Sequence, residues 1–388
     1  MDKNKIVIIP DRINQIENML EGKVMDSVVN FKNESENDSN EINVEDIRDL
    51  VPKKYIDFSK AIEDLGGRLL YIKSGSTGHT FKGVYPNMDN KPNYGVKIVA
   101  YPKKEKYGDM YNPSRPENAE LIMIKILSSF VRKGQTPHIV LPITTFNTSI
   151  KPFLSLKKDD IVNNKKYDDF LKKHKKGYYY KNVSVLISEW ANGGDLLDYI
   201  RKNYKTFKLK HWRIIFFQIL SVLAIIQKKY PSFRHNDMKA NNILVQLIPI
   251  SKKKSKFMYK INGKKYIVPN IGIQLKLWDF DFACIPKLVN NNKVDADWTN
   301  DINIKPEMNR YYDIHYFINT LTKKGFFNEF WNKEYVPEKI HEFVRRVVPS
   351  KYYKGDNVSD RGRILVNDEF MIPDDILKND PLFEVMRN

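Results

Sequence analysis

Hydrophobic and polar positions divide the chain into a strand-rich first part and a helix-rich second part, which meet near residue 191. In the first part, short β-type runs are separated by Gly, Asn and Pro turn signals, which predicts a meander of strands. These runs lie at 68–72, 79–85 and 94–101. In the second part, apolar residues recur with helical spacing at 211–229, after a shorter helical pattern at 194–204.

Further elements surround these runs. Residues 116–133 open with proline and acidic groups and close on basic ones, as the helix dipole favours, so a helix is predicted there. Strand patterns at 138–146 and 183–190 bracket a Lys- and Tyr-rich stretch at 155–181, which is expected to be an inserted loop. The basic segment 251–270 carries an Asn-Gly turn signal and could form a hairpin.

The first fifty residues are expected to form a flexible extension. They contain an acidic run rich in Asn and Ser at 30–46, which has few groups to bury. Ordered structure is therefore predicted to begin near Val51.

Composition and charge exclude several classes of protein. With 41% hydrophobic residues the chain is too apolar to be disordered as a whole. The single cysteine, Cys284, cannot form an internal disulfide, and the N-terminus has no apolar signal sequence, so a reducing compartment is expected. No run approaches the roughly 20 apolar residues that span a bilayer, and the richest, at 214–226, contains two polar residues, which predicts a soluble protein.

Basic residues exceed acidic ones, 65 against 47, which gives a formal net charge of +18. Such a balance is compatible with nucleic acid, an anionic membrane surface or an acidic substrate as partner. Because the lysines are spread along the chain, the plainer interpretation is that they solvate the surface.

Three constellations carry candidate chemistry, and each is weak alone. Gly75 and Gly78 would let backbone N–H groups approach a polyphosphate, although for these glycines alone an ordinary hairpin turn is the preferred interpretation. A lysine at position 97 lies inside an apolar strand run, where an exposed edge position is the simpler interpretation. In HNDMKANN, Asp237, Lys239 and Asn242 lie in a short polar loop that runs into an apolar strand, which places a carboxylate, an ammonium and an amide together.

A fourth feature is the carboxylate of Asp279, in the middle of the apolar run 275–285. Burying an unpaired charge is unfavourable, so a cationic partner is expected there. A Mg²⁺ ion carrying nucleotide phosphates would supply that partner.

In this order, the pieces IKSGSTGHTF, YGVK, HNDMKANN and DFD resemble the protein kinase superfamily over about residues 66–325. The stretch 188–200 is similar to the hinge between kinase lobes, and 311–321 is similar to the buried helix whose first Asp supports the catalytic loop. The resemblance implies an α+β, bilobal protein-kinase-like fold. A small β-rich N-lobe would span 51–190, with an insert at about 155–181. A larger, mainly α-helical C-lobe would span 191–388, with an insert at about 248–272.

The resemblance also implies roles for individual residues. Lys97 would hold the α and β phosphates and pair with a helix glutamate. Glu120 is preferred because its spacing to Ile124 and Leu127 places it on the inward face, and Glu117 is the alternative. The phosphates would be cradled by Gly75, Ser76, Thr77 and Gly78. At the hinge, the backbones of Glu189 and Ala191 would contact adenine, and Asp195 would reach the ribose.

In the second part, Asp279 and Asn242 would bind the metal ions, and ATP and Mg²⁺ are the implied cofactors, with Mn²⁺ as an alternative. Asp237 would accept the proton of the substrate hydroxyl, and Lys239 would neutralise the transferred phosphoryl group. A small Ser188 before the hinge predicts a roomy pocket behind adenine.

Several positions depart from the kinase pattern. Lys73 replaces the first glycine of the loop, Asn236 the Arg of H-R-D and Asp281 the Gly of D-F-G, and no clear A-P-E follows. Without that Arg, a phosphorylated activation segment lacks its usual partner, so activity is predicted not to depend on such phosphorylation. Because of Asn236, the motif H-N-D with a downstream Asn is also similar to that of choline and aminoglycoside kinases. In contrast, Lys239, two residues after the catalytic Asp, is typical of serine/threonine protein kinases.

Within the superfamily, DFDFA and the run through to residue 321 resemble the late serine/threonine kinase of poxviruses and its relatives in other large DNA viruses. The resemblance implies a viral enzyme that phosphorylates Ser and Thr of virion structural proteins during assembly at cytoplasmic factories, and that is packaged in virions. The alternatives are a pseudokinase scaffold, a small-molecule kinase, and a basic protein whose main partner is nucleic acid. No specific nucleic acid is expected as a partner. The lysine-rich inserts could contact acidic substrates or anionic lipid at a membrane surface, although solvated loops are the plainer explanation.

Overall fold

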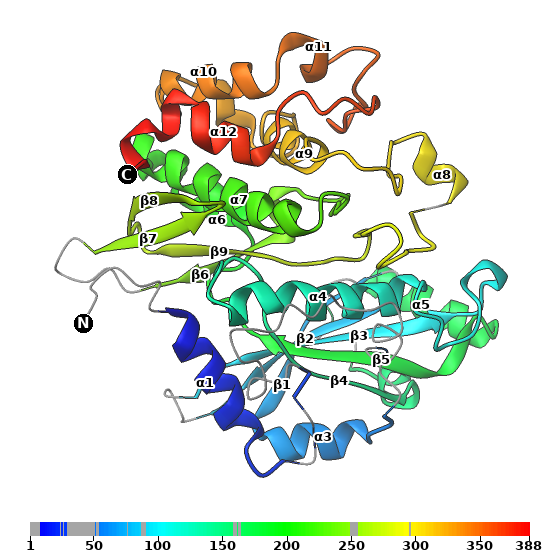
Figure 1. The fold of residues 1–388 in the computed structure, drawn as a ribbon. Coiled ribbons are helices and arrows are strands. Elements are labelled where there is room, and N and C mark those ends of the chain that lie inside the picture. The colour runs from blue at the N-terminus through cyan, green and yellow to red at the C-terminus, as the bar shows by residue number, and fades with distance from the viewer. Residues whose placement is uncertain are drawn as a thin grey trace. The chain divides into compact units, whose positions relative to one another are not determined.

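The computed structural model describes residues 8–23, 25, 27–28, 51, 54–75, 77–86, 91–157, 161, 164–248, 255–294 and 296–388 (Figure 1). By compactness the chain divides into two units. The β-rich unit holds the described residues within 10–128 and 140–190, and the helical unit holds those within 1–9, 129–139 and 191–388.

The β-rich unit is built on one antiparallel sheet with the strand order β1-β2-β3-β5-β4 (Figure 1). The strands are β1 (Arg68–Ser74), β2 (Gly78–Val84), β3 (Tyr94–Pro102), β4 (Pro142–Ser149) and β5 (Tyr179–Glu189). The first three confirm the predicted meander, because their β-type runs end at Gly, Asn and Pro. Of the other two, β4 begins four residues after the start of the strand predicted at 138–146, and β5 begins four residues before the strand predicted at 183–190 and ends one residue before it. Their limits follow the pairing in the sheet and not the hydrophobic run.

Three helices accompany this sheet: α1 (Ile8–Leu20), α3 (Phe58–Leu65) and α5 (Asn164–Lys175). A fourth, α4 (Pro116–Arg132), confirms the helix predicted at 116–133 and begins with proline and glutamate. Short 3₁₀ turns lie at Glu105–Tyr107 and Lys151–Leu154.

The N-terminal segment corrects one expectation, because residues 8–20, which were expected to be part of a flexible extension, form helix α1. Ile16 of α1 is buried, and the backbone of Val28 bonds that of Ile143 in the edge strand β4. Tyr55 pairs with Asn147 of the same strand. The acidic run at 30–46, on which the expectation depended, lies outside the described residues. The segment before Val51 is therefore partly ordered, because it covers an open sheet edge.

The stretch 155–181 was expected to be an inserted loop, and this is wrong for its central part. Helix α5 occupies residues 164–175, and β5 begins at Tyr179. Two aromatic residues of α5, Tyr167 and Phe170, are buried and lie one helical turn apart, so they share a face. Lysines dominate the composition of this stretch, but these two rings decide its structure by packing into the unit.

The helical unit contains α6 (Leu196–Asn203), α7 (Leu209–Lys229), α8 (Asp297–Asn300), α9 (Tyr312–Leu321), α10 (Glu338–Val347), α11 (Ser350–Tyr353) and α12 (Pro373–Asn379). It also contains two antiparallel pairs, β6 (Ile243–Leu247) with β9 (Ile273–Leu277), and β7 (Lys256–Ile261) with β8 (Lys264–Pro269). The second pair confirms the predicted hairpin, whose turn residues Asn262 and Gly263 both have positive φ. Short 3₁₀ turns lie at Tyr204–Thr206, Ala240–Asn242, Asn328–Trp331 and Pro381–Met386.

Helix α7 forms the centre of the helical unit. By length and composition alone it could cross a membrane, and it is longer than the apolar run recognised in the sequence. However, 78% of its most apolar window is buried inside the protein. Phe216 packs against Phe343 of α10, and Phe217 against Phe383. Its apolar surface is therefore used for the core of this unit.

Candidate active site

In the β-rich unit, an ion pair joins the strand lysine to helix α4. Lys97 lies on β3 between the buried residues Val96 and Ile98, and its side chain leaves the opposite face of the strand. Its Nζ lies 2.6 Å from Oε1 of Glu120, and both side chains are largely buried, at 19% and 6% exposed. A charge-assisted hydrogen bond of this length holds the ammonium group of Lys97 in one position.

The alternative glutamate is engaged elsewhere. Glu117 lies 3.3 Å from Nε of the buried Arg115. The same guanidinium donates to the carbonyl of Pro102 at 2.6 Å and to that of Gly108 at 2.9 Å. Glu117 is therefore part of a structural network, and the structure brings Lys97 together with Glu120.

The turn between β1 and β2 carries the glycine-rich residues. The N–H of Gly75 donates to the carbonyl of Gly78 at 2.8 Å, and the carbonyl of Thr77 accepts from Ala100 at 2.8 Å. Ser76 lies outside the described residues. A Cβ on Gly78 would lie 1.8 Å from the carbonyl oxygen of Ile98, whereas the nearest atom to a Cβ on Gly75 would be 3.8 Å away. Gly78 is thus required for the close approach of β2 and β3, and Gly75 has open space beside it.

The residue after the turn, His79, is buried in an aromatic cluster. Its Nδ1 bonds the hydroxyl of Ser74 at 2.8 Å, and its ring packs against Phe153, Tyr167 and Phe170. Burial in this environment lowers the pKa of His79 to about 4. The imidazole is therefore neutral at physiological pH and supports the end of the glycine-rich turn.

This burial predicts acid sensitivity. The unfolded chain binds a proton at His79 below a pH of about 6.5, but the folded chain does so only below about 4, so stability is lost as pH falls through that window. The full contribution is on the order of 3 kcal/mol, of which roughly 2 should be lost between pH 7 and pH 5. Denaturant unfolding of the wild type and of His79→Gln at both pH values measures it. The variant should lose about 2 kcal/mol less than the wild type on acidification, and equal losses would contradict the assignment.

The hinge residues have defined local roles. Glu189 ends β5, where its N–H donates to the carbonyl of Leu141 at 3.0 Å and its carboxylate accepts from the N–H of Leu141 at 2.8 Å. Arg12 of α1 donates to both carboxylate oxygens of Glu189. Ala191 is buried. Asp195 caps helix α6 by accepting from the N–H of Asp198 at 3.0 Å, which engages one oxygen of the carboxylate predicted to reach the ribose.

In the helical unit, the polar loop before β6 brings together the three side chains singled out in the sequence. Oδ2 of Asp237 accepts from Nζ of Lys239 at 2.8 Å and from Nδ2 of Asn242 at 2.8 Å. The same amide donates to the backbone carbonyl of Asp237 at 2.9 Å. The Asp237 side chain is 13% exposed, so the loop holds a partly buried carboxylate between a cation and an amide.

Asp313, a buried aspartate at the start of α9, supports the backbone of this loop. Oδ2 of Asp313 accepts from the N–H of His235 at 2.7 Å, and Oδ1 accepts from the N–H of Asn236 at 2.9 Å. Burial raises the pKa of Asp313, and the two N–H donors act in the opposite direction. Asn236 has a φ of 64° and donates to the carbonyl of Phe282 at 3.0 Å. The loop backbone is therefore held in an uncommon conformation by specific bonds.

One residue of this site could not be found from the sequence. Arg363 lies between α11 and α12, and its guanidinium donates to Oδ1 of Asp237 and to the carbonyl of Asn236. It also donates to the hydroxyl of Tyr312 at 3.0 Å. No local pattern distinguishes this arginine from the others of the basic C-terminal region.

The predicted metal ligands lie at one end of the β6–β9 ladder. Ile243 and Leu277 are paired, Asn242 precedes the first, and Asp279 follows the second by two residues. Asp279 is half-buried and has a φ of 62°. Across the described parts of the chain, no three His, Cys, Asp or Glu side chains gather in a metal-binding group. A cation held here would therefore need phosphate oxygens to complete its coordination, as Mg²⁺ commonly does.

Comparison with known families decides the class of the protein. The profile of the family described as poxvirus serine/threonine protein kinase matches residues 79–382, which is most of the chain. The chain belongs to this family. The enzyme is thus a serine/threonine protein kinase, which uses ATP and a divalent metal ion and acts on protein substrates. Its fold is the α+β bilobal kinase fold, with the β-rich unit as N-lobe and the helical unit as C-lobe.

Individual relatives agree with this assignment. A candidate serine/threonine-protein kinase of Acanthamoeba polyphaga mimivirus is 45% identical over 384 residues, which is 97% of this chain and 80% of that protein. Serine/threonine-protein kinase 2 of monkeypox virus is 28% identical over 173 residues, 42% of this chain and 36% of that protein. The swinepox virus protein of the same name is 32% identical over 120 residues, 30% of this chain and 24% of that protein. All three relatives are viral.

The activation segment of this kinase is held by a buried arginine. The guanidinium of Arg234 donates to the carbonyls of Asn303, at 2.5 Å, and Glu307, at 3.2 Å, and its Cζ lies 3.9 Å from the ring centre of Tyr312. Asp281, at the position of the usual glycine, pairs with Lys293 of the same segment. These bonds hold the segment between Asp279 and Asp313 in place.

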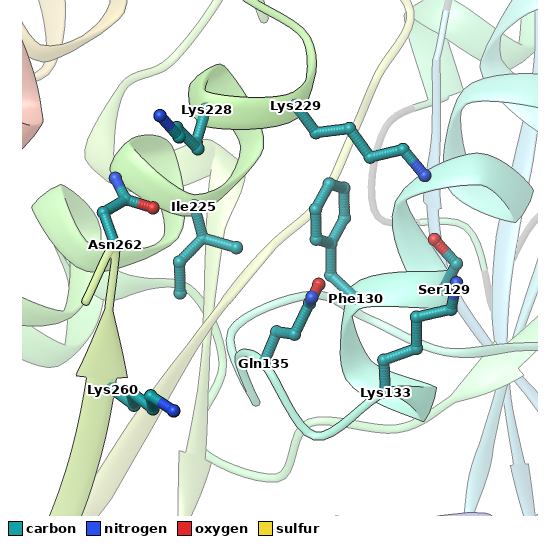
Figure 2. Close-up of a pocket in the computed structure, with 9 residues that line it drawn as sticks. All are labelled: Ser129, Phe130, Lys133, Gln135, Ile225, Lys228, Lys229, Lys260 and Asn262. Carbon is teal, nitrogen blue, oxygen red and sulfur yellow. The ribbon is translucent and has the colours of Figure 1, made fainter. Parts of the chain in front are cut away.

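The C-lobe also contains a basic hollow of about 220 Å³, shown in Figure 2. It is lined by Ser129, Phe130, Lys133, Gln135, Ile225, Lys228, Lys229, Lys260 and Asn262. None of these is a candidate active-site residue of the kinase, so the hollow is a separate feature of this lobe.

Proposed function

We propose that this family member is an active phosphotransferase in which Asp237 accepts the proton of the substrate hydroxyl. The observation that carries the proposal is the shared contact of Oδ2 of Asp237 with Lys239 and Asn242, each at 2.8 Å. Such contacts orient the carboxylate toward one reacting hydroxyl. Lys239 would neutralise the transferred phosphoryl group and so contribute through charge stabilisation.

In the N-lobe, we infer that Lys97 binds the α and β phosphates and that Glu120 holds it in place, supported by their 2.6 Å ion pair. The turn residues Gly75, Ser76, Thr77 and Gly78 would lie against the phosphates. The backbones of Glu189 and Ala191 would contact adenine, and Asp195 the ribose. The free side of Gly75 supports close backbone approach there.

Asn242 and Asp279 would hold Mg²⁺, with Mn²⁺ as the alternative cation. Their position at one end of the β6–β9 ladder and their oxygen ligands fit a hard cation. Bound there, the cation would offset negative charge on the nucleotide phosphates.

The substrates we propose are Ser and Thr residues of virion structural proteins, with activity in cytoplasmic viral factories and in virions. Support comes from relatives in mimivirus and poxviruses. We also propose domain limits of 51–190 for the N-lobe, extended by helix α1, and of 191–388 for the C-lobe, to which residues 129–139 of the helical unit are added.

The test is transfer of label from radioactive ATP by the purified full chain with Mg²⁺ or Mn²⁺. Basic and acidic proteins are offered beside choline and an aminoglycoside, and the labelled amino acid is identified. Phosphoserine or phosphothreonine is the expected product. Label on a small molecule would favour the small-molecule kinases, and ATP binding without any transfer would favour a pseudokinase scaffold.

Activity is expected not to require phosphorylation of the activation segment. Between Asp279 and Asp313 the only Ser or Thr is Thr299, which is fully buried and donates its hydroxyl to backbone carbonyls. Phosphatase treatment, checked by mass spectrometry, should leave kcat within about twofold, since Asn236 replaces the arginine that pairs with such a phosphate in the kinase pattern. Loss of activity on dephosphorylation, restored by rephosphorylation, would contradict this.

A further inference from the structure

The loop between α11 and α12 contributes a buried arginine to the candidate active site. Arg363 is held in a tight turn, in which the N–H of Ser359 donates to its carbonyl at 2.8 Å and its own N–H donates to the Ser359 hydroxyl at 3.0 Å. Val358 and Ile364 pair across this turn. The backbone that carries the arginine is therefore fixed by bonds within the loop.

The guanidinium is fixed as well. Its side chain is 9% exposed, and its Cζ lies 4.0 Å from the ring centre of Tyr316, one helical turn after Tyr312 on α9. One nitrogen donates to the hydroxyl of Tyr312 and to the carbonyl of Asn236, and the other to Oδ1 of Asp237. A planar guanidinium can make these bonds together, whereas an ammonium group cannot.

We propose that Arg363 is a positioning residue for the phosphoryl-transfer step, which holds the Asp237 carboxylate in its productive orientation. The inference rests on the proposed role of Asp237. Lys239 and Asn242 take one oxygen of that carboxylate, and Arg363 takes the other, so rotation about the side-chain bonds is blocked on both sides. Each oxygen has a second lone pair, so Oδ1 can still accept a substrate hydroxyl.

This arrangement suits the chemistry. Phosphoryl transfer passes through a loose transition state in which positioning contributes more than the strength of the base. A cation bound to the base therefore costs little, while a displacement of the carboxylate by about 1 Å can lower the rate by roughly 100-fold. Through Arg363, the loop between α11 and α12 thus holds the carboxylate that acts on the substrate hydroxyl.

The experiment is a double-mutant cycle on the full chain, with kcat and the KM for ATP measured for wild type, Arg363→Met, Asp237→Asn and the double variant. Arg363→Met should lower kcat by roughly 30- to 100-fold, with the KM for ATP within about twofold. In the Asp237→Asn background the same change should lower kcat by no more than about threefold, because the carboxylate it positions is gone. Arg363→Lys should not restore the rate.

The matched control is Arg361→Met, which removes an exposed arginine from the same loop and should leave kcat unchanged. If Arg363→Met melts too low to assay, Arg363→Gln, which keeps a donor to Tyr312, replaces it in the cycle. An active wild type whose kcat is unaffected by the change, or is affected equally in both backgrounds, would overturn the positioning role alone. A wild type without any transfer would overturn the proposed function, and the positioning role with it.

Discussion

Replacing Asp237 with Asn is expected to lower kcat by about 10²- to 10⁴-fold, which is the range for removal of a positioned general base or acid. The amide cannot take the substrate proton, and it would place a donor against Lys239 or Asn242, whose contacts with Oδ2 are both donations. The KM for ATP should change by no more than about twofold, since the proposed nucleotide contacts are made by other residues.

Asp198→Asn serves as the matched control for this prediction. Asp198 is an exposed carboxylate on α6, and its replacement should leave kcat unchanged. The measurement is steady-state transfer to a protein substrate, with circular dichroism and thermal melting to verify folding. An Asp237→Asn variant that keeps a tenth or more of wild-type kcat would show that another group acts as base.

Replacing Gly78 with Ala is expected to destabilise the N-lobe by about 3 kcal/mol, at the upper end of the usual range for overpacked sites. The new Cβ would lie 1.8 Å from the carbonyl oxygen of Ile98, 2.8 Å from its carbonyl carbon and 2.9 Å from Cα of Val99. These are backbone atoms of β3, so they can move only if the β2–β3 pairing is distorted. Because Lys97 precedes Ile98, kcat should fall as well.

Gly75→Ala separates the structural effect from the proposed nucleotide contact. Apart from its chain neighbours, the nearest described atom to this Cβ would lie 3.8 Å away, so stability should change by less than about 1 kcal/mol. Stability could even increase, because alanine lowers the conformational entropy of the unfolded chain. If the backbone at Gly75 contacts the phosphates, the KM for ATP should increase. Thermal unfolding and ATP kinetics of both variants test the pair, and similar melting temperatures for the two would contradict the proposed division of roles.

The sequence predicted correctly those elements that depend on interactions between residues close together in the chain. The meander β1–β3 and the helices α4 and α7 were predictable because hydrophobic periodicity and turn residues act over a few positions. Helices α1 and α5 were missed because charged and polar residues dominate their neighbourhoods. In α5 two buried aromatic residues decide the structure, and in α1 Arg12 bonds Glu189, which lies 177 residues further along the chain.

The sequence by itself determined the kinase class and the polar loop residues Asp237, Lys239 and Asn242, because these side chains lie within six residues and their spacing is set by one short loop. Helical spacing favoured Glu120 over Glu117 as the partner of Lys97, and the tertiary structure brings Lys97 and Glu120 together across 23 residues while Arg115 holds Glu117. Tertiary structure alone decided that Arg363 reaches Asp237 across 126 residues. Contacts between residues so far apart in the sequence depend on how whole helices, strands and loops pack together, and local residue patterns do not specify that packing.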